Sequence, residues 1–198
     1  MGNWEILILA RECFAYSNYL YNPATKEESE YLSVSQDFDF IRHILWRITI
    51  IEMSKIFSSS KNRDRFNLRH FLTKLKHGGQ FSQVGIKDSS VTKWETELLD
   101  NELTINNILT LRDKIYAHSD LRKDDFRNIE ISFQDIEKLI CIAESIVKEI
   151  YFTVFDADTE MSTIVFDKQN FNIIRILADE KNRTIKAILG SKFTITKP

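Results

Sequence analysis

The stretch LRDKIYAHSD, Leu111 to Asp120, places an arginine within a helical pattern and a histidine where that pattern ends. On a wheel of about 100° per residue, one arc of roughly 120° contains Arg112 and a row of apolar side chains. The row is Ile105, Ile108, Leu109, Ile115 and Tyr116. The wheel therefore directs Arg112 toward the core or an interface, with His118 at the expected helix end. Because burying a guanidinium is costly unless it is paired, the pattern indicates either a buried ion pair or a site that receives an anion.

Length and composition predict a helical protein. The 198 residues suit one domain with a sizeable core, and a content of only 5 Gly and 2 Pro favours long helices over a turn-rich β fold. The formal charge of −2 excludes a global field that would attract nucleic acid or anionic lipid. Any contact with nucleic acid must be local, and we expect no DNA partner.

The cysteines and the apolar segments predict a cytoplasmic location. Cys13 and Cys141 lack CxxC spacing and lie in apolar helical contexts, which is typical of reduced, buried thiols, with a disulfide between them as the alternative. The N-terminus has no signal-peptide pattern, and no segment reaches the ~18 uncharged apolar residues of a membrane span. We therefore expect no membrane partner.

Capping residues and apolar periodicity predict where the helices lie. The first half is expected to contain a helix from about Asn3 to Tyr21, a polar linker at Ala24–Ser33, a long helix capped by Ser35 and a short helix from Asn67 through Lys76. A helix from Val91 to about Leu99 then continues through a kink into a helix over Leu103–Ala117. The last element of the bundle is a long helix after Ser132, with Asp135 in capping-box spacing.

The C-terminal part has conflicting signals. The segments NIIRILA and RTIKAIL flank DEKN, which fits a small hairpin, while their apolar spacing also fits a helix. We therefore expect a helical bundle over residues 1–155 and an extension over residues 156–198 that belongs to the same globule, as a helix or a small hairpin.

An arginine and a histidine together can bind a phosphodiester and move its proton. The planar guanidinium matches phosphate oxygens, and imidazole titrates close to neutral pH. His118 would act as general base or acid on the 2′-hydroxyl or the leaving 5′-oxygen, while Arg112 stabilises charge on the phosphate, with no metal required.

Six helical residues separate Arg112 and His118 by about 9 Å along the axis and 120° around it, so they converge through the long Arg112 side chain, a helix end near His118, or a second copy. A twofold dimer of facing motif helices would satisfy this geometry and cover the apolar arc.

The stretch RDKIYAHSD resembles the signature of the HEPN superfamily, and more narrowly the HEPN domains of abortive-infection U-type proteins. The order of RITIIEMSKIF, a loop and NLRHFLTKL is also similar, so the resemblance covers roughly residues 35–155. It implies an all-α up-and-down bundle and a homodimer formed through the motif helices. In active members it implies metal-independent RNA cleavage in bacterial defence or toxin–antitoxin systems, with an antitoxin protein as a further partner.

By the same resemblance, Arg112 and His118 are the catalytic pair, Asp113 is the polar residue that orients them, and Asp120 is placed to hold the histidine. No cofactor is implied. The superfamily also contains inactive members, so the alternative function is a non-catalytic dimerisation module that binds a nucleotide, RNA or a partner protein.

Simpler interpretations of the same residues remain open. Arg112 would be structural if it paired with a buried acid such as Glu102 or one on the last long helix, and His118 would be structural if it only capped a helix C-terminus. The stretch LRHFLTKLKHGG would be a basic RNA-contacting patch or simply a solvated helix face. The other histidines lack partners at zinc-like spacing, so we expect no metal site.

Overall fold

The computed structural model describes residues 3–58, 67–116, 129–157 and 172–192. Within these ranges the chain forms eight α-helices, one π-helical turn and no strand, which confirms the all-α prediction. The elements are α1 (Asn3–Tyr21), α2 (Lys26–Ser33), α3 (Gln36–Phe57), α4 (Leu68–Leu75), α5 (Asp88–Asp100), α6 (Glu102–Leu111), η1 (Arg112–Tyr116), α7 (Phe133–Phe155) and α8 (Asn172–Lys192).

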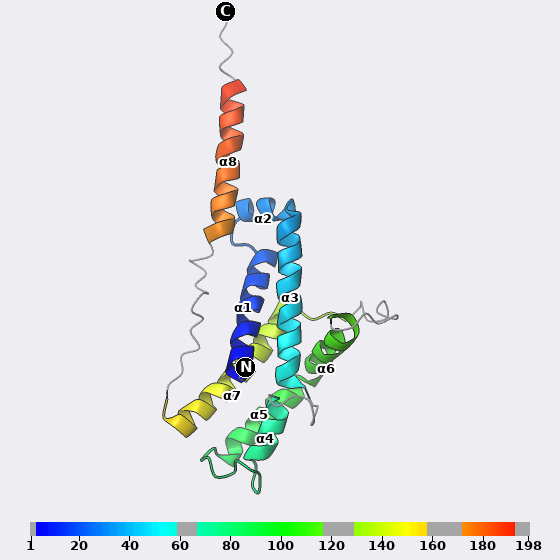
Figure 1. The fold of residues 1–198 in the computed structure, drawn as a ribbon, viewed down its shortest axis with the longest axis vertical. Coiled ribbons are helices and arrows are strands. Elements are labelled where there is room, and N and C mark those ends of the chain that lie inside the picture. The colour runs from blue at the N-terminus through cyan, green and yellow to red at the C-terminus, as the bar shows by residue number, and fades with distance from the viewer. Residues whose placement is uncertain (1–2, 59–66, 117–128, 158–171, 193–198) are drawn as a thin grey trace, which may run out of the picture.

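Helices α1 and α3 form the centre of the fold and lie side by side along its long axis (Figure 1). Helix α7 packs against α1, while α6 and η1 pack against α3. The main core is built from apolar side chains of α1, α3, α4, α5, α6 and α7, and Ile50, Met53, Phe57, Trp94 and Ile108 are among its most deeply buried members. Helices α4 and α5 lie at one end of the molecule, and α2 and α8 at the other (Figure 1).

The capping residues start the helices where the sequence predicts. Ser35 accepts the backbone N–H of Phe38, and the Asn67 side chain accepts that of His70 at 2.6 Å. Ser132 and Asp135 form a reciprocal capping box at the start of α7, with the Asp135 N–H donating to Ser132 Oγ at 3.1 Å. These contacts satisfy N–H groups that have no partner within the helix.

The prediction of a polar linker at residues 24–33 is wrong, because α2 forms there. Thr25 caps the helix, and Glu28 completes a capping box from the third helical position. Glu28 is only 3% exposed, and its carboxylate also accepts the Tyr19 hydroxyl at 2.8 Å. A single carboxylate thus holds α2 to the end of α1.

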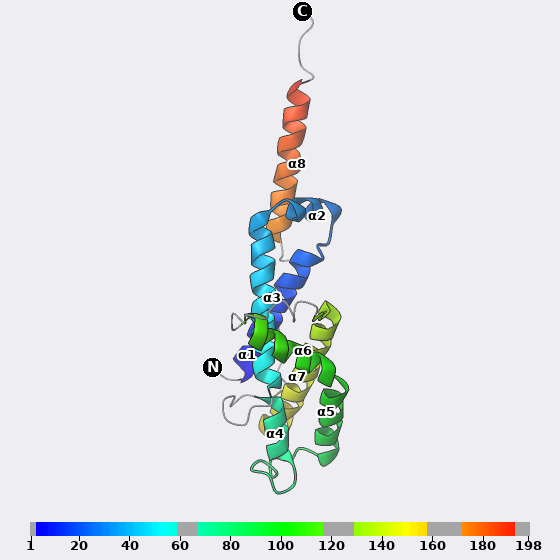
Figure 2. The same ribbon diagram turned by 90° about the vertical axis from the view of Figure 1, so that its right-hand side faces the viewer.

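The C-terminal segment is helical over Asn172–Lys192, so the hairpin alternative does not hold for these residues. The base of α8 contacts α2, and Ile174 is fully buried in a second core cluster with Leu20 and Leu32. From there α8 extends past α2, away from the main core (Figure 2). The domain boundary at residue 155 stays a prediction.

The two cysteines differ in their surroundings. Cys13 is buried in α1, and burial raises the pKa of its thiol to about 11. Cys141 on α7 is exposed, so the prediction that both thiols are buried is wrong for Cys141. No helix in the described ranges is both long enough and apolar enough to cross a bilayer.

Candidate functional site

The motif arginine lies at a change in helix type. Helix α6 ends at Leu111, and the next five residues, Arg112–Tyr116, form the π-helical turn η1. The backbone N–H of Arg112 is shared between the carbonyls of Ile108 and Leu109, so the hydrogen-bond pattern changes at this residue. Such π turns are rare and are often found at functional sites. The sequence predicts one α-helix over Leu103–Ala117, and the structure corrects this.

The apolar stripe beside Arg112 faces the chain's own core. Ile105 is 1% exposed and Ile108 is 0% exposed, both belong to the main core cluster, and the half-buried Leu109 packs against it. These side chains are covered within the chain, so they do not form the open apolar arc that a facing motif helix would cover. The argument for a dimer from an uncovered arc therefore fails for these residues.

Arg112 itself is half-buried, and its side chain is 25% exposed. Its Nε donates to Oδ1 of the neighbouring Asp113 at 2.7 Å, and the Asp113 side chain is 52% exposed. Glu102, the predicted buried partner, pairs instead with Arg69 of α4. The structure therefore contradicts an Arg112–Glu102 ion pair, and it places beside Arg112 the residue that the resemblance names as its orienting group.

His118 and Asp120 lie in residues 117–128, outside the described residues. The chain on both sides of this segment is anchored to α3. On one side η1 contacts α3, and on the other the Phe133 ring packs on Trp46 with centroids 4.7 Å apart. The same ring lies 5.3 Å from that of Tyr21 and 5.9 Å from that of Phe14. The described residues on either side of the segment 117–128 are thus both packed against α3.

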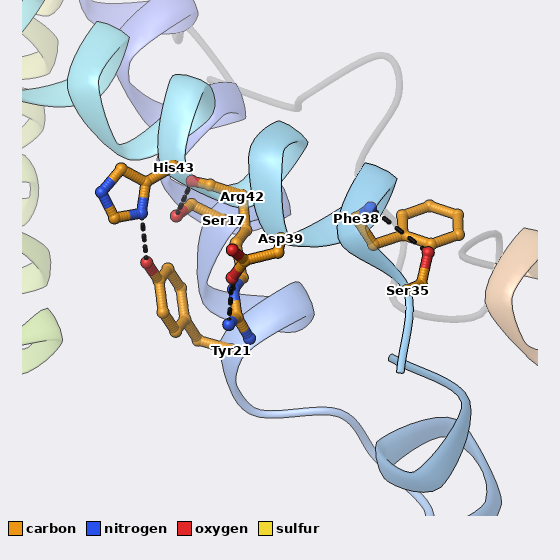
Figure 3. A network of polar contacts seen from close by, with 7 residues as sticks. All are labelled: Ser17, Tyr21, Ser35, Phe38, Asp39, Arg42 and His43. Atoms are coloured by element: carbon orange, nitrogen blue, oxygen red, sulfur yellow. Dashed lines mark hydrogen bonds and ion pairs between the residues drawn. The ribbon is translucent and has the colours of Figure 1, made fainter. Parts of the chain in front are cut away.

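A polar network on α1 and α3 adjoins the second of these points (Figure 3). Tyr21 Oη and His43 Nδ1 are 3.2 Å apart, and the Arg42 guanidinium lies 4.6 Å from the centre of the Tyr21 ring. Arg42 also pairs with Asp39, and Ser17 donates to the Arg42 carbonyl at 3.1 Å. Burial raises the pKa of Tyr21, so the phenol stays protonated at neutral pH and is able to donate to the imidazole. No local pattern predicts this pairing, because Tyr21 and His43 meet only through the packing of α1 on α3.

The predicted basic patch is largely balanced by acids and an aromatic ring. Arg69 pairs with Glu102, and Lys76 Nζ lies 2.7 Å from Glu95 Oε1. Lys74 Nζ lies 5.6 Å from the centre of the Phe81 ring. These residues tie α4 to its neighbours, which supports the interpretation of a solvated structural face. The described part of the chain contains no cluster of His, Cys, Asp or Glu able to hold a metal ion.

Comparison with known proteins identifies a family for this chain. Neither the curated proteins nor the solved structures contain a match to the chain. The sequence profile HEPN_AbiU2, described as AbiU2, matches residues 4–171, a range that includes Arg112, Asp113 and His118. This match is wider than the resemblance over residues 35–155, and it also contains α1 and α2. The chain belongs to the HEPN AbiU2 family, an abortive-infection defence family.

Proposed function

We propose that the protein is a metal-independent endoribonuclease of a bacterial defence or toxin–antitoxin type system, and that Arg112 and His118 carry the reaction. The surroundings of Arg112 are the observation that supports this proposal. Its guanidinium is one-quarter exposed, and its acidic partner among the described residues is a neighbour on the same turn. A guanidinium has five N–H donors, and the contact with Asp113 uses the one on Nε. The other donors match the oxygens of a phosphodiester.

The proposed reaction needs only these side chains and the RNA. His118 accepts the proton of the 2′-hydroxyl, and the 2′-oxygen forms a bond to the adjacent phosphorus. The bond from phosphorus to the 5′-oxygen breaks, and that oxygen leaves with a proton from the protonated imidazole of His118 in a second copy of the chain. The products are a 2′,3′-cyclic phosphate and a 5′-hydroxyl. Arg112 stabilises the extra negative charge on the phosphate oxygens, and Asp113 fixes the direction of its guanidinium.

A second copy would supply a separate acid and base. We propose, from the family resemblance, that the motif helices of two copies face each other and place both Arg–His pairs in one cleft. Since the apolar stripe of α6 is buried within the chain, such a contact would be made by the polar outer face of α6 and by η1. An antitoxin would bind over the same cleft and block access of RNA.

The test is RNA cleavage in the presence of a chelator. Wild type is expected to cut single-stranded RNA in EDTA and to leave 2′,3′-cyclic phosphate ends, whereas His118→Ala loses this activity. His77→Ala is the matched control, because His77 is an exposed histidine outside the motif. Equal residual cleavage by wild type and His118→Ala would remove the nuclease proposal.

The second candidate is a non-catalytic HEPN module that binds a nucleotide, RNA or a partner protein. The Arg112–Asp113 contact favours this non-catalytic function, because the guanidinium is paired with a carboxylate of its own chain rather than with a substrate. This function predicts that wild type and His118→Ala bind RNA with equal affinity and that neither cuts it. Filter binding and gel analysis on the same samples separate the two candidates.

A further inference from the structure

A cavity lies between the first turn of α2 and the polar side of α8, at the end of the molecule where these two helices meet (Figures 1 and 2). Its volume is about 490 Å³, within the usual range of small-molecule sites in proteins. Ala178 and Asn182 line it from α8, and these short side chains leave room between the two helices. We call this space the α2–α8 cavity.

The wall formed by α8 carries charges that alternate in sign. On a wheel of about 100° per residue, Arg175, Asp179 and Lys186 lie within about 40° of one another, so they follow one line along the helix. All three line the cavity, together with Arg183. Asp179 lies about 6 Å along the axis from Arg175 and about 10 Å from Lys186. From the base of α8 outward, the wall therefore presents a positive group, a negative group and a positive pair.

Glu28 belongs to the α2 wall, but its carboxylate is already used within the chain. Oε1 accepts the Tyr19 hydroxyl at 2.8 Å, and Oε2 accepts the backbone N–H groups of Ala24 and Thr25, both at 2.9 Å. These contacts fix the first turn of α2, and with it the position of the wall. A ligand in the cavity must therefore use the other charged groups.

Those other groups are not paired with one another. Glu27 from α2 and both Asp179 and Lys186 from α8 line the cavity, and within the described residues their side chains form no hydrogen bond or ion pair. Arg183 Nη1 lies 3.8 Å from the Glu180 carboxylate, and both side chains of that pair are more than 60% exposed, so the contact fixes neither of them. Opposite charges thus line one cavity and remain apart, an arrangement that a ligand with charges of both signs would bridge.

We propose that the α2–α8 cavity binds a small dicarboxylic amino acid. Its ammonium group lies at Asp179 and Glu27, with one carboxylate at Arg183 and Lys186 and the other at Arg175. In such a molecule the two carboxylates flank the ammonium group, so its order of charges is the reverse of the order along α8. A guanidinium has five N–H donors and is able to bind a carboxylate beside another partner. A plain anion would meet Asp179 and Glu27, and a plain amine would meet Lys186, so like charges disfavour both.

A ligand held in this way joins α2 to α8. Since a molecule that binds only the folded protein stabilises the parts it contacts, amide hydrogen exchange in α8 is expected to slow when the cavity is occupied. Helix α6 and η1 lie away from this end of the molecule (Figure 1). The proposed ligand site is therefore separate from the motif arginine and does not depend on the proposed nuclease function.

Titration calorimetry on the full chain with three matched molecules tests the charge pattern. L-Glutamate carries two carboxylates and an ammonium group, glutarate lacks the ammonium group, and L-glutamine lacks the charge of the second carboxylate. The three are titrated at equal pH and ionic strength, because salt screens exposed charges. L-Glutamate is expected to bind at least about tenfold more tightly than either of the others, since each of these loses a charge-assisted contact.

Two pairs of variants locate the site. Lys186→Ala is expected to weaken L-glutamate binding about tenfold, whereas Lys181→Ala, on another side of α8 over the Tyr31 ring, keeps the wild-type affinity. Glu27→Gln is expected to weaken the binding of L-glutamate but not that of glutarate, because only L-glutamate has an ammonium group. Glu30→Gln is its control, since Glu30 lies on the same helix outside the cavity lining. All four replaced side chains are exposed, so the fold is retained.

Three results would overturn the proposal. The first is the absence of saturable L-glutamate binding, and the second is equal affinity for glutarate, which would indicate a site for anions alone. The third is unchanged binding by Lys186→Ala, which would place the ligand elsewhere on the chain. RNA cleavage by Lys186→Ala is expected to equal that of wild type, so failure of this proposal and failure of the nuclease proposal are distinguishable.

Discussion

Replacing Arg112 with alanine tests whether this residue serves the fold or a ligand. Its ion pair joins a half-buried guanidinium to an exposed carboxylate, and such pairs contribute about 0.2–1 kcal/mol. A chain of this length changes its melting temperature by roughly 2–4 °C for each kcal/mol. We therefore expect Arg112→Ala to lower Tm by no more than about 4 °C. In the proposed nuclease, loss of this donor is expected to reduce cleavage by about 100-fold or more.

Arg69→Ala is the matched control for this experiment. The Arg69 side chain is 33% exposed, close to the 25% of Arg112, and it also forms an ion pair, with Glu102. It is expected to shift Tm by a similar amount and to leave cleavage at the wild-type rate. Calorimetry and a cleavage assay on both variants give the comparison. A fall of about 10 °C or more for Arg112→Ala would refute the reasoning, because losses of about 3–5 kcal/mol are typical of a broken buried ion pair.

Three further predictions concern the fold. Ile108→Ala removes a side chain that is 0% exposed, and it is expected to reduce the free energy of unfolding by about 2–5 kcal/mol in a denaturant titration. Thr25→Ala removes the cap of α2 at a cost of about 1 kcal/mol, which hydrogen exchange would detect as faster exchange confined to α2 and the base of α8. At pH 8 iodoacetamide is expected to label the exposed Cys141 first. The buried Cys13, whose pKa is about 11, is expected to be labelled only in denaturant or as the pH approaches 11. Equal labelling rates of the two thiols in the folded protein, measured by mass spectrometry, would contradict the burial of Cys13.

Local signals in the sequence predict helix starts well where an apolar face follows the cap. Ser35 and Ser132 each precede a long apolar pattern, and both caps are present in the structure. Thr25 and Glu28 form a capping box at the start of α2, as Ser132 and Asp135 do at the start of α7. Helix α2 is polar, however, and buries only Glu28 and Leu32. A search for apolar periodicity therefore misses it, while a search for capping boxes would have found it.

Tertiary contacts decide the features that the sequence leaves open. The segment that becomes α8 fits a hairpin or a helix by local pattern, and the pocket for Ile174 between Leu20 and Leu32 provides packing for the helix. Those two residues lie far away in the sequence, so no local window contains the information. The exposure of Cys141 has a similar origin, because it depends on which side of α7 the core occupies.

The partner of Arg112 shows how much of the site a wheel is able to predict. An ion pair with Glu102 is already excluded by distance along α6, since ten helical residues rise about 15 Å, too far for the two side chains to meet. A pair with Asp113 is not expected on an α-helix, because neighbours in sequence point to different sides. In the structure this pair forms where η1 begins, at the residue whose N–H is shared between two carbonyls. The direction of the guanidinium is thus set by its own turn and its own neighbour rather than by an acid of the core.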